Sequence, residues 1–528
     1  MTHARLVGSL AVLMLALAPA TSQGVDWGLR VGTCVTDITP VSPALVDEYE
    51  TAFGHAGTVN HSDPVFMAGF GNDRQATGYH DKLWARGVVI DGPGGRVALV
   101  ALDVIGYFNN EIQTIRQLVS PDSHVDFVVV TSTHQHEGPD TLGLWGPDEL
   151  TSGTDFAYLD FVNASVARCI DEAAAHLRPA RVRFGLARSD GLSLGTDPED
   201  DGFGVSDGKV LTGDAALAPD TEGRIVDSRL SVMQFTDRHF PRRALVTLVN
   251  FASHPESLGS NNTLVTSDFP HYVRQDLERR FGSIAIWVSG ALGVLQGPLD
   301  IDVLDPDTGL PAPRRSFRFA EVHGGELAER AASGLPHWLL ATAFAPIRFA
   351  STNPVPVRLD NPFFRLFTAI GVLPARRSLY TNGVPDASVG FPYPPPFDSI
   401  PQSLGSDIHT EVGLLRVGLG SFAIVPTELD PQIGEQYRSW MSDTLPSWLR
   451  PFHHTFIVGL GNDHIGYQVP FDKWDDSCHA CAPFVIAGFP QFCPVQPIDC
   501  NTVFSNNVGQ QVDPSVSDAL APLIDATH

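Results

Sequence analysis

The chain has 528 residues and a formal net charge of −26, from 60 acidic and 34 basic side chains. This excess of negative charge argues against nucleic acid or an anionic membrane as a partner. A chain of this length buries a large core and usually forms more than one structural lobe.

Residues 1–22 are typical of a signal peptide. A weakly basic start (His3, Arg5) precedes an apolar stretch over residues 6–17, and residues 18–20 read Ala-Pro-Ala, a small-residue cleavage pattern. No later stretch has the ~20 uninterrupted apolar residues that a spanning helix needs. We therefore expect a secreted protein, extracellular or periplasmic, with at most peripheral membrane contact.

The first strand that points to chemistry covers residues 127–130, which are apolar and β-branched, and His134 and His136 follow it. If the chain stays extended there, residues i and i+2 face the same side, so both rings can reach one metal ion. Residues 138–139, Gly-Pro, then open a loop. The alternative is a polar strand end whose histidines bond only backbone and water.

Three further strand ends carry side chains that can bind metal. The stretch 248–255 ends at His254, and the stretch 422–428 ends at Glu428. The stretch 456–467 runs through a glycine-rich turn to Asp463, His464 and Tyr467. Several strand ends with such residues are expected of a catalytic site on the rim of a sheet.

Helices alternate with these strands, which predicts an α/β protein. Apolar residues at helical spacing cover 157–177, 271–281 and 319–332. A proline-rich insertion follows at about residues 346–402. Its strongly apolar stretch 362–370 is either a lid that faces lipid or, as we favour, a buried connecting helix.

The six cysteines of an exported chain favour disulfides. Cys478, Cys481, Cys493 and Cys500 lie in a proline-rich C-terminal segment, residues 476–528, where two disulfides are favoured over a four-cysteine zinc site. Cys34 and Cys169 can pair with each other or stay buried and free.

Taken together, these motifs resemble the neutral/alkaline, non-lysosomal ceramidases, which are secreted or ectoplasmic zinc amidases. Residues 133–139 resemble the T-H-T-H-S-G-P motif of this family, and residues 250–255 its F-A-x-H-P/G segment. Residues 425–428 resemble its proline-glycine-glutamate element, with Thr427 in place of glycine, and 459–467 keep its G-L-x-N spacing to a tyrosine. Residues 31–40, 67–71 and 85–90 resemble its N-terminal signatures. The likeness covers roughly residues 30–300 and 405–475.

The resemblance implies a Zn²⁺ ion held by His134, His254, Glu428 and Tyr467. His136 then serves in proton transfer and is not a ligand, in contrast to the geometric interpretation given above. Arg188 resembles the active-site arginine of the family, although the pattern that follows it there is absent here. The implied fold is an α/β catalytic domain with a mixed sheet over residues 23–475, without the C-terminal immunoglobulin-like domain of the family.

One departure from the family concerns its G-D-V-S-P-N hexapeptide, whose serine is taken to be catalytic. The corresponding stretch here is 293–298, and the serine position falls on Gln296, which cannot act as a nucleophile. Water activated by the metal can replace it, and the amide of Gln296 can donate to an oxyanion.

The sequence thus predicts a secreted zinc hydrolase that cleaves the N-acyl amide bond of a ceramide-like lipid. The alternatives are a diverged relative that acts on another amide or ester, and a binding protein without catalysis. An amidohydrolase-type barrel needs a later lysine and further histidines at strand ends, and lysine is nearly absent. A metallo-β-lactamase-like site needs H-x-H-x-D-H, which residues 137–139 do not provide.

Overall fold

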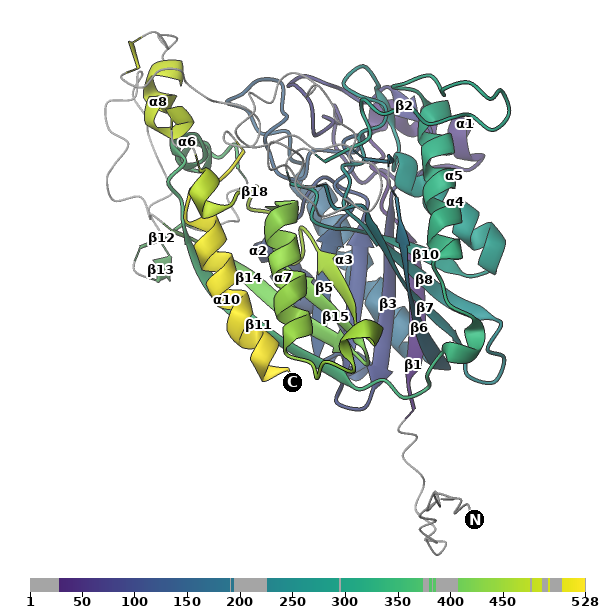
Figure 1. The fold of residues 1–528 in the computed structure, drawn as a ribbon. Helices are drawn as coiled ribbons and strands as arrows, with labels where there is room; N and C mark the ends of the chain where they lie inside the picture. Colours follow the sequence, from purple (N-terminus) through teal and green to yellow (C-terminus); the bar gives the residue numbers. More distant parts are fainter. Residues whose placement is uncertain are drawn as a thin grey trace, which may run out of the picture.

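The computed structural model consists of four layers, with helices outside two facing β-sheets (Figure 1). It describes residues 28–189, 191–193, 226–293, 296–373, 379–381, 383–385, 407–474, 477–486, 492–493 and 506–527. The expected signal peptide, Cys500 and residues 386–402 of the insertion lie outside these residues.

The first sheet has eight strands in the order β10-β8-β7-β6-β1-β3-β4-β5. The pairs β4–β5 and β8–β10 are parallel and the other pairs are antiparallel, so the sheet is mixed. Its strands are β1 (Arg30–Asp37), β3 (Trp84–Gly92), β4 (Gly95–Leu102), β5 (Phe127–Ser132), β6 (Arg178–Arg188), β7 (Arg229–Asp237), β8 (Ala244–Phe251) and β10 (Ile284–Ser289).

The second sheet has six strands in the order β13-β12-β14-β15-β17, with β11 also paired to β14. It consists of β11 (Ile347–Arg358), β12 (Tyr380–Thr381), β13 (Val384–Pro385), β14 (Asp407–Val417), β15 (Gly420–Ile424) and β17 (His454–Val458). Two short parallel pairs lie outside both sheets: β2 (Gly78–Tyr79) with β9 (Leu264–Val265), and β16 (Glu428–Leu429) with β18 (Tyr467–Gln468).

Alternate residues along a strand of the first sheet face opposite layers of the protein. Val88 and Ile90 of β3 face the core between the two sheets, whereas Ala85 and Val89 face the helices. This period of two is what a strand buried on both faces requires.

Helices α1 (Val46–Phe53), α2 (Asn109–Leu118) and α3 (Phe156–Ala175) cover one part of the first sheet, and α4 (Phe269–Phe281) and α5 (Phe317–Ser333) cover the part around β7, β8 and β10. Helices α6 (Pro362–Ile370), α7 (Pro431–Asp443) and α10 (Val512–Ala526) pack on the second sheet, and α8 (Ser477–Ile486) contacts α6. Short 3-10 turns are Pro43–Leu45, Pro121–Ser123, Trp338–Leu340, Arg450–Phe452 and Phe471–Lys473.

The predicted α/β class and the three predicted helices, observed as α3, α4 and α5, are confirmed. The predicted division at residue 475 stays a prediction, and α10, which lies beyond it, packs against β11 and β14. Among the described residues, no helix has the length and apolar character needed to cross a membrane.

The described cysteines form disulfides, which confirms the favoured prediction. Cys34 on β1 is bonded to Cys169 on α3, and Cys481 is bonded to Cys493. Cys478 is also disulfide-bonded. The competing four-cysteine zinc site is therefore wrong, because these sulfur atoms are not available as thiolates.

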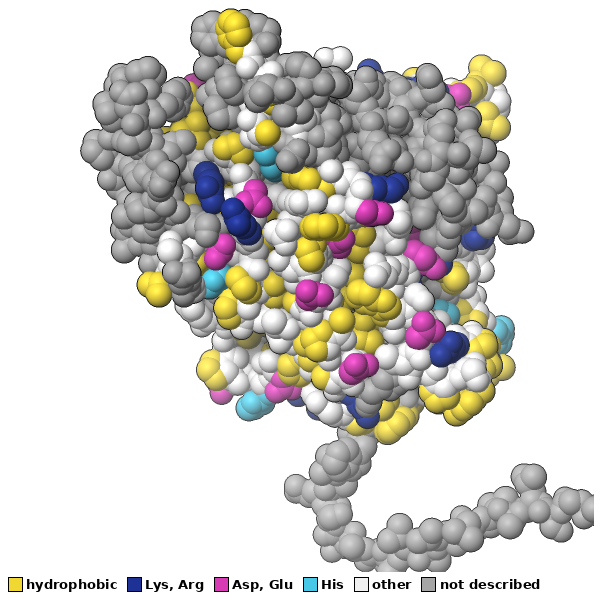
Figure 2. Space-filling model, turned by 60° about the vertical axis from the view of Figure 1, so that its left-hand side comes forward, with side chains coloured by type: hydrophobic (Ala, Val, Ile, Leu, Met, Phe, Trp, Pro, Cys, Tyr) yellow, Lys and Arg dark blue, Asp and Glu magenta, His cyan; other side chains and the backbone are white. Residues whose placement is uncertain are grey.

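On the face shown in Figure 2, the acidic side chains of the described residues are not gathered in one patch. Figure 2 turns the left-hand side of Figure 1 toward the reader and shows them scattered among apolar and uncharged groups. The described part of this face shows no continuous basic area, as the net charge of −26 leads one to expect.

Candidate metal centre

Four side chains from separate strand ends meet at one rim of the molecule. His134 follows β5 and His254 follows β8, while Glu428 and Tyr467 begin β16 and β18. Glu428 and Tyr467 are direct partners across the parallel β16–β18 pair, so their side chains leave the backbone next to each other. All four residues are buried.

The distances among these groups fit one small ion. Glu428 Oε2 lies 3.4 Å from His134 Nε2 and 3.1 Å from His254 Nε2, and the Tyr467 hydroxyl lies 3.4 Å from His254 Nε2. Ligands at 2.0–2.2 Å from a tetrahedral zinc ion are separated by roughly 3.3–3.6 Å. Two of the three separations lie in this range and the third, 3.1 Å, is slightly shorter, so the three are close to the edges of one tetrahedron around a shared point.

Backbone carbonyls orient both histidine rings toward that point. The Nδ1 of His134 donates to the Ile105 carbonyl at 2.6 Å, and the Nδ1 of His254 donates to the Gln296 carbonyl at 2.9 Å. Each bond fixes the tautomer that leaves Nε2 free to bind a metal, as is usual for histidine ligands.

The extended conformation expected at the two histidines ends before them. Strand β5 stops at Ser132, and His134 has a left-handed backbone with φ of +64°. The period-of-two argument from the sequence is therefore wrong at this point. The rings of His134 and His136 nevertheless lie 5.0 Å apart between centroids, because the turn brings them together.

His136 lies beside the cluster with neither ring nitrogen hydrogen-bonded to a described residue. One of its ring nitrogens lies within 4.8 Å of a ring nitrogen of His134 and of one of His254, and Nδ1 is 3.7 Å from Glu256 Oε2. A Cβ atom at Gly69, whose φ is +98°, would lie within 2.6 Å of His136 Cβ, so this ring needs a glycine behind it. A buried, unpaired imidazole is suited either to metal binding or to proton transfer.

His464 completes the cluster on the other side of the carboxylate. Its Nε2 lies 3.2 Å from Glu428 Oε1, and the ligand atoms of His134, Glu428 and His464 all lie within 4.8 Å of one another. The sequence marked His464 as able to bind metal, but the family resemblance assigned it no role. Glu256, two residues after His254, lies beside His136, and no motif in the sequence predicted this position.

In the metal-free cluster, burial lowers the pKa of His254, but the hydrogen bond and charge of Glu428 outweigh it and raise that pKa above its usual value. Burial alone would raise the pKa of Glu428, but the neighbouring histidines hold that pKa well below its usual value. Burial lowers the pKa of His134, and burial with the two neighbouring rings lowers that of His136 further. Burial and the Glu428 charge raise the pKa of Tyr467 well above its usual value. A bound cation would lower the pKa of Tyr467 and so favour its phenolate form.

An apolar pocket of about 760 Å³, part of it open to solvent, ends at this cluster. His134, His136, Glu428, His464 and Tyr467 line one part of it. The other walls are mainly apolar: Ile105, Phe108, Leu142, Leu144, Trp145, Leu359, Phe364, Leu373, Ile408, Ile465 and Val508. The apolar helix 362–370 noted in the sequence, α6, thus supplies a pocket wall through Phe364 and Thr368.

Comparison with solved structures identifies the fold. A neutral ceramidase from Pseudomonas aeruginosa matches with a TM-score of 0.64 at 16% sequence identity, over 95% of this chain and 75% of the other. A ceramidase complexed with C2 matches with a TM-score of 0.63 at 15% identity, over 95% and 76% of the two chains. The chain has the neutral ceramidase fold. No family model matches the sequence.

Within this ceramidase fold, Gln296 has a different place from the one expected. Its Nε2 donates to the carbonyls of Ala252 and Asp227 at 2.6 and 2.9 Å, and its Oε1 accepts from the Asp227 N–H at 3.1 Å. Both amide hydrogens are therefore used, and Gln296 is not among the residues that line the pocket. The geometry gives it a supporting role for the His254 turn instead of the expected role at an oxyanion.

Arg188 is not brought to the cluster either. It is the last residue of β6, paired with Arg229 of β7, and its side chain is exposed. It does not line the pocket. This position does not support the role at a substrate oxygen that the resemblance implied.

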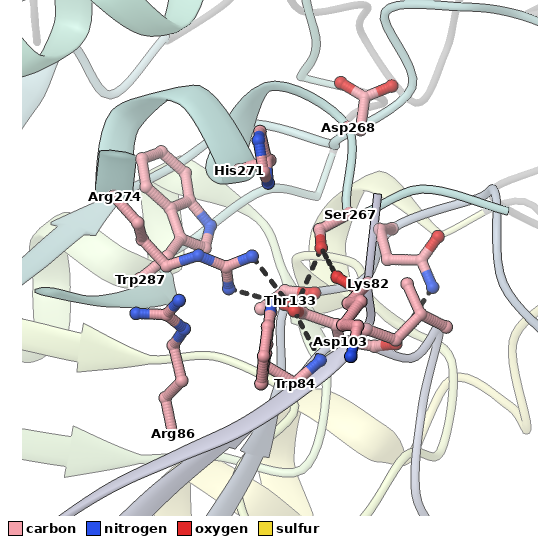
Figure 3. Close-up of polar contacts among 12 residues, drawn as sticks. Lys82, Trp84, Arg86, Asp103, Thr133, Ser267, Asp268, His271, Arg274 and Trp287 are labelled. Carbon is pink, nitrogen blue, oxygen red and sulfur yellow. Dashed lines mark hydrogen bonds and ion pairs between the residues drawn. The ribbon is translucent and has the colours of Figure 1, made fainter. Parts of the chain in front are cut away.

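A buried hydrogen-bond network holds the segment that carries the two histidines, and Figure 3 shows its part around Asp103, Thr133 and Arg274. The guanidinium of Arg274 donates to both carboxylate oxygens of Asp103 at 2.7 and 2.9 Å. Gln135 Nε2 donates to the Asp103 carbonyl at 3.0 Å, and Ser289 Oγ donates to the Thr133 carbonyl at 2.7 Å. A charge-assisted pair with two parallel hydrogen bonds of this kind is stronger than a neutral hydrogen bond.

Proposed function

We propose that this protein is an exported zinc-dependent hydrolase that cleaves the N-acyl amide bond of a ceramide-like lipid. The observation that carries the proposal is the convergence of His134, His254, Glu428 and Tyr467, at spacings close to tetrahedral, beside an apolar pocket. His134, Glu428 and Tyr467 line this pocket. The similarity to structures of ceramidases supports the choice of an amide substrate.

The donor set suits zinc better than the common hard cations. Two imidazoles, a carboxylate and a phenol give mixed nitrogen and oxygen donors, whereas magnesium and calcium prefer oxygen alone. When bound, zinc supplies a Lewis acid that polarises a carbonyl and brings the pKa of water close to neutrality.

The pocket walls favour a neutral, apolar acyl group. Among the described lining residues, Glu428 is the one carboxylate, and no lysine or arginine is present. Each methylene group buried against such walls contributes about 0.8 kcal/mol. An acyl chain therefore supplies the binding free energy, and the polar cluster fixes the position of the amide.

His136 is proposed as the proton-transfer residue. Its pKa is held well below its usual value by burial and by His134 and His254, so its ring is neutral near pH 7 and can accept a proton. It lines the pocket beside the cluster. The described residues offer its nitrogens no competing hydrogen bond.

Export is proposed from the expected signal peptide and from the disulfides, which form in oxidising compartments. The negative surface fits a water-soluble enzyme that meets its lipid substrate at a neutral interface.

Metal content and hydrolysis test the proposal together. The full chain, produced by secretion, should contain about one zinc ion per molecule and should release fatty acid from an N-acylsphingosine. His254→Gln should lose most of the zinc and the activity. His323→Gln is the matched control, because His323 is equally buried but lies in α5 among Phe269 and Phe319. Zinc retained in full by His254→Gln would refute the site, and zinc without amide hydrolysis would favour a binding protein.

A further inference from the structure

The two oxygens of Glu428 have different partners. Oε2 faces His134 and His254, the side on which the tetrahedral spacing converges. Oε1 faces His464, whose Nε2–H donates to it at 3.2 Å. We propose that His464 is a positioning residue of the metal centre, which holds Oε1 so that Glu428 binds the metal through Oε2 alone. This inference rests on the proposed function, because it requires a metal at the cluster.

The geometry favours a hydrogen bond over direct ligation by His464. His134 and His254 both lie close to Glu428 Oε2, and the Tyr467 hydroxyl lies close to His254 Nε2. His464, in contrast, is bonded to Oε1, the other oxygen of Glu428. A carboxylate bound through one oxygen, with the other in a hydrogen bond, is a common arrangement around metal ligands. It keeps Oε1 in a hydrogen bond with His464, so that one oxygen of Glu428 remains for the metal.

The turn that carries His464 is built to present this ring. Leu460 and Asn462 have left-handed backbones, with φ of +53° and +63°, a conformation that is costly for leucine and better tolerated by asparagine. Asn462 is anchored to β5, since its N–H donates to the Val130 carbonyl at 2.7 Å and its Oδ1 accepts from the Val130 N–H at 3.0 Å. The His464 N–H in turn donates to Asp463 Oδ1 at 2.8 Å. A strained and well-anchored turn indicates that the position of His464 matters.

The residue opposite the ring gives a second, independent observation. A Cβ atom at Gly106 would lie 2.8 Å from His464 Cγ and closer still to Nδ1, so the ring occupies the space that a side chain there would fill. Gly106→Ala therefore moves the His464 ring without changing any metal-binding side chain.

The test measures metal affinity and needs no turnover. Metal-free protein is titrated with Co²⁺, whose visible absorption reports its ligands, and with Zn²⁺ in competition with a chelating dye. His464→Ala should bind one ion per chain about 10–100-fold more weakly, as expected when an outer partner of a ligand is lost. His464→Gln, which can place an N–H near the same oxygen, should recover most of the affinity with the parent absorption spectrum.

Gly106→Ala should weaken binding in the same way, and the double variant Gly106→Ala/His464→Ala should be no weaker than His464→Ala alone. Gly325→Ala in α5 is the control, because its added Cβ would meet only the carboxylate of Asp276.

Three results would overturn the inference. Parent-like affinity in His464→Ala would refute the positioning role while leaving the metal proposal intact. A changed Co²⁺ spectrum in His464→Gln, with affinity as low as in His464→Ala, would make His464 a direct ligand. No stoichiometric metal in the parent protein would refute the proposed function and, with it, this role.

Discussion

Replacement of Gln296 by methionine should loosen the turn that orients His254. Methionine keeps the length and volume of glutamine but removes its hydrogen bonds to Asp227 and Ala252. The main chain of Gln296 accepts from both the N–H and the Nδ1 of His254, at 2.7 and 2.9 Å. Movement of this turn therefore changes the direction of the His254 ring.

The size of the effect follows from the groups left without partners. The substitution leaves one buried N–H and two buried carbonyls of Asp227 and Ala252 short of a bond. An unsatisfied buried group costs roughly 1–3 kcal/mol, and carbonyls less than N–H groups. We expect a loss of about 2–4 kcal/mol of unfolding free energy and a loss of about 10-fold in zinc affinity, the range for an altered outer partner of a ligand.

Denaturant unfolding and zinc competition measure the two effects separately. Gln234→Met is the matched control, because Gln234 is fully buried on β7 and bonds Arg183 and Thr247 away from the metal cluster. It should lose stability but keep the zinc affinity of the parent. Parent-like stability and affinity in Gln296→Met would refute the supporting role, and equal zinc loss in Gln234→Met would show that the effect is only global.

His136→Gln should keep about one zinc per chain but lower turnover by ~10²-fold, as expected for a lost proton-transfer group; zinc loss equal to that of His254→Gln would make His136 a ligand. The folded-state pKa of His136 is lowered, so in metal-free protein its contribution to stability is present above pH ~6.5 and is lost as pH falls, by up to about 1.4 kcal/mol per pH unit. His136→Gln should therefore flatten the loss of stability measured from pH 7 to 5, and an unchanged slope would contradict the assignment. Phe364→Ala removes part of a pocket wall and should raise KM for a long-chain N-acyl substrate by ~10-fold or more, with little change for an N-acetyl substrate. Equal changes in KM for both substrates would show that the acyl chain binds outside this pocket.

The sequence by itself determined the local elements and the chemical character of the strand ends. The apolar run 127–130 forms β5, and polar residues that can bind metal follow the strands, as with His134 and His254. These features depend on neighbours a few residues apart, so periodicity and side-chain type are enough to find them. The strand ends predicted that Glu428 and Tyr467 belong to the same site as the histidines, whereas the choice of four metal ligands rested on the resemblance to a family.

Only the tertiary structure decided how these residues face one another. Gln296 bonds to Asp227, 69 positions away, and His464 takes the second oxygen of Glu428, 36 positions away. Arg188, similar to a family residue by local pattern, is exposed at the end of β6. Local sequence does not encode such relations, because the order and twist of the sheets set which strand ends meet, and one turn, as at His134, changes where a ring points.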